Sequence, residues 1–233
     1  SAQVAKGRLE DMRFSLAALL RGVLLLAVPA SLGLILLRVP LITLLYQRGS
    51  FDTHSTQLVA WALLFYAFGL VGHSLVEIIS RAFYALHDTK TPVFVGVIAM
   101  SLNVLLSIAF SRMFISIDWM PHGGLALANS LATFLEAFAL MFLMRGRLAG
   151  IEGKNILNGA WKALLAGGCM SAALFGWINL TRNASAWLVA LAGIILGALV
   201  YGLALLVLKT PELTRVLDFI KRKVLSRGNG STL

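Results

Sequence analysis

Charged residues and cysteine are both scarce in this chain of 233 residues. Only 13% of the residues are charged, whereas about 25% is usual in a soluble domain. Because 59% of the residues are hydrophobic and the charges are too few to cover a soluble surface, a soluble domain is excluded. The single cysteine, Cys169, rules out an internal disulfide and a CxxC metal site. It lies in an apolar run and is interpreted as a small hydrophobic residue.

The sequence also lacks the motifs of common enzymes and nucleic-acid-binding proteins. It has no nucleophile elbow, no Gly-rich phosphate loop and no pair of carboxylates, and its four histidines share no metal-ligand spacing. The net charge of +10 comes from lysines and arginines that stand between apolar runs. Membrane orientation explains such a pattern better than binding to a phosphate backbone. We expect no enzymatic activity, no bound metal or organic cofactor and no nucleic-acid partner.

Six apolar runs are long enough to cross a bilayer, which takes about 20 helical residues. They lie at about residues 14–37, 54–80, 92–111, 123–144, 160–181 and 186–208. The sequence therefore predicts an all-α polytopic membrane protein with about six transmembrane helices. Pro29 is expected to kink the first span, with the freed carbonyls bonded by Ser31 or by neighbouring helices. Residues 39–55 are expected to form a short interfacial helix and a turn.

The distribution of basic residues predicts the orientation. If the N-terminus is cytoplasmic, sixteen lysines and arginines fall on the cytoplasmic side and four on the outer side. The positive-inside rule favours this arrangement, and an even number of spans then places both termini in the cytoplasm. The first residues are polar and do not form a signal peptide. Because the chain begins at Ser1, we expect an N-terminal portion to be absent.

Three segments are too particular to be generic membrane sequence: PASLGL at Pro29–Leu34, LLYQRGSFD at Leu44–Asp52 and RAFYALHDTKTPV at Arg81–Val93. Together they resemble the second half of the MurJ/MviN family, the lipid II flippases of bacterial cell-wall synthesis. This family belongs to the multidrug/oligosaccharidyl-lipid/polysaccharide exporter superfamily. The resemblance covers essentially the whole chain and is strongest between Leu24 and Val93.

The resemblance implies that the six spans are helices nine to fourteen of a fourteen-helix transporter in the bacterial inner membrane. Such a transporter moves an undecaprenyl-linked peptidoglycan precursor between leaflets by alternating access. Residues 1–150 would be four helices of the C-terminal lobe, 151–208 the last two helices, and 209–233 a basic cytoplasmic tail. The family's cationic cavity comes mainly from helices one, two, seven and eight, so the pyrophosphate-binding residues would lie in an N-terminal lobe. Alternatives are a polysaccharide-lipid flippase or drug/cation antiporter of the same superfamily, or a non-transporting membrane scaffold.

The loop after the second span carries several charges. Glu77 and Arg81 stand four residues apart on one helix face, a spacing that favours an ion pair. Asp88 and Lys90 follow in a turn that leads into the next helix. One interpretation is a solvated connector with a capping role. The other is a gating loop whose ion pairs differ between inward-open and outward-open states.

Polar residues inside the third and fourth spans suggest an ion site. Glu136 is the acid best embedded in a span and is a candidate for proton or sodium coupling, or for a polar contact within the bundle. Asn103 and Ser107 are one turn apart, as are Asn129 and Thr133. The resemblance implies a sodium site in this helix pair, where Asn103 matches an asparagine but Ser107 replaces an acidic ligand. The other interpretation is hydrogen bonding between helices.

Small residues recur along the last two spans at helical spacing. Gly168 and Ala172 are four residues apart in one span, as are Gly193 and Gly197 in the other. Each pair allows close approach of a neighbouring backbone. In the family, the last two helices form an apolar groove for the polyprenyl tail of the lipid. The resemblance therefore implies that these four residues line a lipid-tail groove.

Overall fold

The computed structural model describes residues 2–210, with side chains from Leu9 onward. The helices of this part, in chain order, are α1 (Ala2–Tyr46), α2 (Thr53–Ala85), α3 (Lys90–Ser116), α4 (Pro121–Arg147), α5 (Gly153–Leu180) and α6 (Ala186–Val207). All six are long and apolar enough to cross a membrane. The predicted all-α membrane fold and its six spans are confirmed. Most of the predicted basic tail, from residue 211, lies outside the described residues.

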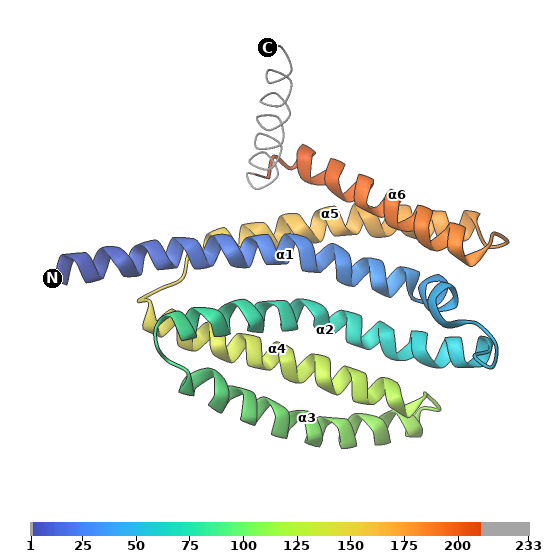
Figure 1. Cartoon of the computed structure of the whole chain (residues 1–233), viewed down its shortest axis with the longest axis horizontal. Helices are drawn as coiled ribbons and strands as arrows, with labels where there is room; N and C mark the ends of the chain where they lie inside the picture. The colour runs from blue at the N-terminus through green and yellow to red at the C-terminus, as the bar shows by residue number, and fades with distance from the viewer. Residues whose placement is uncertain (1, 211–233) are drawn as a thin grey trace, which may run out of the picture.

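Helix α1 extends further than the sequence predicts. It runs without interruption through Pro29 and Pro40 to Tyr46, so the expected interfacial helix is its last part. Figure 1 shows that these last turns leave the line of the rest of the helix. Continuity across a proline is possible in a bundle because neighbouring helices bond the carbonyl groups that the proline leaves free.

The hydrogen bonds around Pro29 show how α1 is held. Proline has no N–H group, so Pro29 leaves the carbonyl of Leu25, four residues earlier, without its helical donor. The hydroxyl of Tyr201 on α6 donates to this carbonyl at 2.7 Å. The Ser31 hydroxyl was the other candidate donor, but it bonds the Ala67 carbonyl of α2 at 2.6 Å instead. The part of α1 around Pro29 is thereby hydrogen-bonded to helices on both of its sides.

Helix α1 lies between two groups of helices. It packs against α2 on one side and against α5 and α6 on the other, while α4 lies between α2 and α3 (Figure 1). Buried residues of α1, α5 and α6 form one apolar core, and buried residues of α1 to α4 form a second. The division of the chain near residue 150 stays a prediction.

Glycine 124 brings α3 and α4 into close contact, and its replacement should weaken the fold. A Cβ atom at Gly124 would lie 2.7 Å from the carbonyl carbon and oxygen of Phe110, which belong to the α3 backbone and cannot rotate away. We expect Gly124→Ala to force the helices apart and to lower the free energy of unfolding by about 1–3 kcal/mol. The matched control is Gly146→Ala, also on α4, where a Cβ meets no atom within 4 Å. Thermal unfolding in detergent should show a loss only for Gly124→Ala, and equal melting temperatures would contradict this packing.

Candidate functional site

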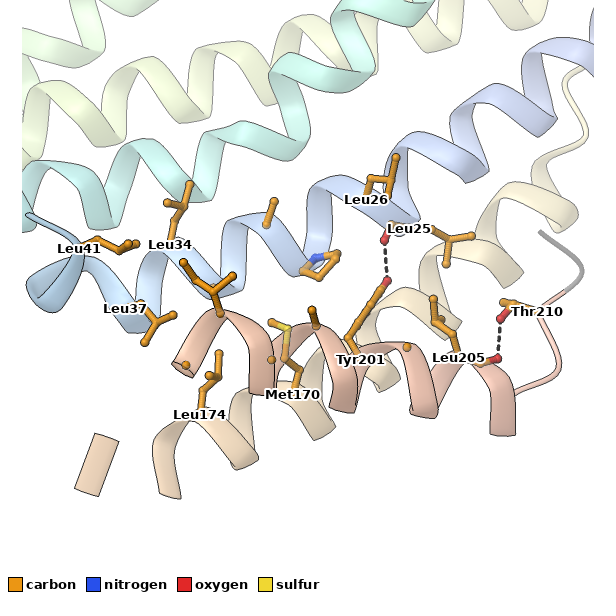
Figure 2. Close-up of a pocket in the computed structure, with 18 of the residues that line it drawn as sticks. Leu25, Leu26, Leu34, Leu37, Leu41, Met170, Leu174, Tyr201, Leu205 and Thr210 are labelled. Carbon is orange, nitrogen blue, oxygen red and sulfur yellow. Dashed lines mark hydrogen bonds between the residues drawn. The ribbon is translucent and has the colours of Figure 1, made fainter. Parts of the chain in front are cut away.

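An apolar cavity of about 770 Å³ lies between α1 and α6, with α5 closing its inner side (Figure 2). Its lining residues are Gly22, Leu25, Leu26, Pro29, Ala30, Gly33, Leu34, Leu37 and Leu41 of α1, Met170 and Leu174 of α5, Gly193, Ile194, Gly197, Ala198, Tyr201, Gly202 and Leu205 of α6, and Thr210. We refer to this cavity as the α1–α6 groove. Cavities of this size and apolar character are typical of sites for small molecules or lipid chains.

The two polar side chains that line the groove are already hydrogen-bonded. The Tyr201 hydroxyl donates to the Leu25 carbonyl, and the Thr210 hydroxyl donates to the Leu205 carbonyl at 2.6 Å (Figure 2). Neither hydroxyl proton remains for an occupant. The groove therefore suits an occupant that needs no hydrogen bonds, such as a hydrocarbon chain.

Glycines of α1 and α6 create the space in the groove. A Cβ atom at Gly22, Gly33 or Gly202 would meet no atom within 4 Å, so these positions border open space. A Cβ at Gly193 would lie 3.0 Å from a methyl group of Leu37, so Gly193 allows close helix packing instead. Sequence reasoning missed Gly22 and Gly33. Their spacing of eleven residues, about three helical turns, is the signal that could have indicated a shared face.

The structure brings two of the four predicted groove residues into the groove and leaves two outside it. Gly193 and Gly197 line it, whereas Gly168 and Ala172 are exposed on another face of α5. The reason is that α5 packs with a different face, which is formed by Ala163, Ala166, Met170 and Leu174. The groove therefore lies between α1 and α6 and not between the last two helices alone.

The charged loop between α2 and α3 is joined to α4. Glu77 and Arg81 form the ion pair that their spacing predicts, at 2.6 Å and exposed to solvent. Asp88 pairs with Arg147 at the end of α4, at 2.7 Å, a partner that sequence reasoning missed. The Lys90 side chain is exposed, and the salt bridge of Asp88 among the described residues is with Arg147 rather than with Lys90. A gating role for this loop stays a prediction.

Asp88 also fixes the start of α3. It accepts hydrogen bonds from the Thr91 hydroxyl at 2.8 Å and from the Thr91 backbone N–H at 3.1 Å. These two bonds, with a smaller contribution from Arg147, lower the pKa of Asp88 below its ordinary value. The carboxylate is therefore ionised at neutral pH, and the link between this loop and α4 persists there.

The polar residues inside the spans form two separate sets. Asn103 and Ser107 bond each other on α3 at 3.3 Å. Asn129 and Thr133 of α4 lie instead against His73 of α2, which the sequence did not single out. Within residues 9–210, no hydrogen bond joins the two sets, and no cluster of three His, Cys, Asp or Glu residues is placed to hold a metal ion.

Glu136 lies at the α3–α4 contact. A Cβ atom at Gly96 of α3 would come within 3.4 Å of the Glu136 carboxylate oxygen. The side chain is half-buried, one turn beyond Thr133 on α4. The structure thus places Glu136 on the same helix as the His73 partners, while Asn103 belongs to the other set.

Comparison with known proteins decides the family. The family model described as "Lipid II flippase MurJ" matches residues 1–197. The chain belongs to the MurJ lipid II flippase family. The resemblance expected from the sequence motifs is therefore confirmed. The family and the six apolar helices of the described residues together indicate a multi-pass membrane protein.

Two curated MurJ relatives illustrate the similarity. The probable lipid II flippase MurJ of Vibrio cholerae is 32% identical over 172 residues, which is 72% of this chain and 31% of that protein. The probable lipid II flippase MurJ of Haemophilus influenzae is 32% identical over 210 residues, which is 85% of this chain and 39% of that protein. The chain thus spans less than two fifths of the length of either relative.

A solved structure shares the MurJ fold with this chain. The lipid II flippase MurJ in an inward closed conformation superposes with a TM-score of 0.68 at 25% sequence identity. The match covers 85% of this chain and 39% of that structure's chain. The helical arrangement that forms the α1–α6 groove therefore belongs to a fold that a MurJ protein adopts.

Proposed function

We propose that this chain is part of a flippase that moves lipid II, an undecaprenyl-linked peptidoglycan precursor, across the bacterial inner membrane. The observation that carries the proposal is the match of residues 1–197 to the family model of lipid II flippases. The six apolar helices support placement in a membrane. Transport by alternating access gives this architecture a mechanism, because packed helical groups can rock against one another around a shared site.

The α1–α6 groove is proposed to hold part of the polyprenyl tail. Its lining is apolar and its two hydroxyl groups are bonded to backbone carbonyls. A hydrocarbon chain that enters the groove therefore breaks no hydrogen bond. A polar sugar–peptide head group would find no free donors there. We therefore assign the groove to the tail and the recognition of the head group to another part of the transporter.

The transporter is proposed to include an N-terminal lobe of the same protein. Alternating access needs two lobes around a common cavity. The described helices pack on the two sides of α1 and are proposed to form part of one lobe only. The N-terminal lobe would supply the cations that bind the pyrophosphate. Coupling to sodium or protons through Asn103 or Glu136, and gating by Glu77, Arg81, Asp88 and Lys90, are further proposals about this chain.

Both termini of the chain are proposed to face the cytoplasm, on the basis of the sixteen-to-four distribution of basic residues. Single cysteines placed at Ser50 and Asn183, in a background without Cys169, should react with an impermeant thiol reagent in intact cells. A cysteine at Ser226, which lies outside the described residues, should react only after the membrane is opened. Labelling at Ser226 without labelling at the other two positions would reverse the orientation.

Growth of cells depleted of their own lipid II flippase tests the proposed function. The whole transporter that contains this chain is expected to restore growth and cell shape. A transporter that is present in the membrane but leaves the cells to lyse would refute lipid II transport. It would favour a different substrate within the exporter superfamily.

A further inference from the structure

A histidine well inside α2 forms a hydrogen-bonded group with two polar residues of α4. The Nε2 atom of His73 lies 3.2 Å from the amide nitrogen of Asn129 and 3.4 Å from the hydroxyl oxygen of Thr133. The Thr133 hydroxyl donates to the backbone carbonyl of Asn129 at 2.9 Å. Ionisable side chains at this depth of a membrane helix are rare and usually functional.

The partners of His73 fit both protonation states of its ring. In the neutral tautomer that carries its proton on Nδ1, Nε2 has a lone pair, which accepts a hydrogen bond from the Asn129 amide N–H. When Nε2 carries a proton, the Thr133 hydroxyl oxygen can accept its hydrogen bond. A half-turn of the Asn129 amide would then present the amide oxygen to Nε2 as a second acceptor. A purely structural contact would need partners for one state only.

The described helices leave the His73 side chain uncovered. Its side chain is exposed, whereas Thr133 is buried and Asn129 is half-buried. Ionisable residues inside membranes face the protein interior or a water-filled cavity rather than lipid. We infer that this face of α2 lines an aqueous path in the whole transporter.

The helices packed around His73 carry few charged groups. Glu136 is seven residues from Asn129 on α4, on the same side of that helix and about 10 Å further along it. Glu77 is one turn from His73 on α2, but it is paired with Arg81. The neighbouring α1 carries its described cations, Arg13, Arg21 and Arg38, towards the two ends of its span. The acidic residues of α1, Glu10 and Asp11, lie near its N-terminal end. Glu136 on α4 is therefore the acidic side chain on the same helix face as the partners of His73.

We propose that His73, held by Asn129 and Thr133, is the proton-binding site that couples a proton gradient to lipid movement. This inference rests on the proposed flippase function. When the site is open to one side of the membrane, a proton from water binds the Nε2 lone pair and forms an N–H bond. When the site is open to the other side, that N–H bond breaks and the proton returns to water.

The test uses the whole transporter in vesicles that contain lipid II, with the membrane potential held at zero and a pH gradient of one unit. If one proton moves per lipid, the steady-state distribution of lipid II between leaflets should shift about tenfold per pH unit. His73→Gln keeps hydrogen-bonding atoms near the position of Nε2 but takes up no proton. This variant should equilibrate lipid II without any shift. The matched control, His54→Gln in the exposed first turn of α2, should keep the tenfold shift.

Protonation of His73 can also be measured directly, which decides the question if His73→Gln is inactive. In ¹⁵N-histidine NMR of the wild-type transporter, the His73 signal should show that the ring takes up a proton as the pH is lowered. A ring that does not titrate overturns the proposal, as does a pH-driven shift of normal size in His73→Gln. A wild-type response to a sodium gradient but not to a pH gradient overturns it as well. If the wild type moves no lipid II at all, the proposed flippase function fails, while the NMR titration still decides whether His73 binds a proton.

Discussion

Replacing Gly33 by leucine in the whole transporter is expected to reduce lipid II flipping about tenfold while the protein stays folded. A Cβ atom at Gly33 meets no atom within 4 Å, and Gly33 lines the α1–α6 groove, so we expect the new side chain to extend into the groove. If it displaces about 60 Å² of tail contact, the lost apolar burial is about 1.5 kcal/mol, which is roughly a tenfold change. The measurement is the flipping rate per correctly folded transporter.

Gly168→Leu is the matched control for this experiment. Gly168 also has open space around it, but it is exposed on α5 outside the groove. The same leucine there should leave flipping unchanged. Gly193→Leu is less suitable, because a side chain at Gly193 would press on Leu37. A loss of flipping could then come from overpacked helices as well as from a filled groove. If Gly33→Leu flips lipid II at the wild-type rate, the groove does not hold the tail.

Expressed alone, this chain is expected to give no growth when the native flippase is depleted. The α1–α6 groove is proposed to hold only the lipid tail, and alternating access needs a second lobe that closes a shared cavity. We expect the viable count to fall as far as in cells without any flippase gene. The check on folding is thiol labelling of a cysteine at Ser50, which should show insertion into the membrane.

Rescue by the chain alone would contradict the proposal that a second lobe is required. Co-expression of the chain with the remaining N-terminal part of a MurJ relative is the complementary experiment. Growth that appears only with both parts would support the two-lobe arrangement. Absence of growth with both parts, when both are inserted and associated, would contradict it.

Local sequence patterns predicted the helices well because they depend on local properties. The length of an apolar run sets each span, and the spacing of Glu77 and Arg81 gives an ion pair within one turn. Pro92 and Pro121 lie in the first turns of α3 and α4, as expected for a residue without an N–H group. Most helices extend beyond the predicted apolar runs, and α1 does so most, because it begins at Ala2 and continues through Pro40 to Tyr46.

The candidate site was harder to predict because it depends on which helices pack together. The small residues at Gly193 and Gly197 indicated one wall of the groove, but nothing local shows that α1 forms the opposite wall. The pairing of Asp88 with Arg147 joins residues 59 positions apart. The bond between Tyr201 and Leu25 joins residues 176 positions apart. Such contacts are set by the packing of whole helices, and a single sequence carries no direct record of them.

The central claim, that this chain belongs to a working lipid II flippase, is tested most directly by watching the lipid cross a membrane. The purified whole transporter would be reconstituted into vesicles with labelled lipid II in the inner leaflet, and an impermeant reagent outside would detect lipid that reaches the outer leaflet. We predict rapid exposure of lipid II with the wild type and about tenfold slower exposure with Gly33→Leu. Exposure no faster than in protein-free vesicles, from a transporter shown to be folded and inserted, would contradict the account.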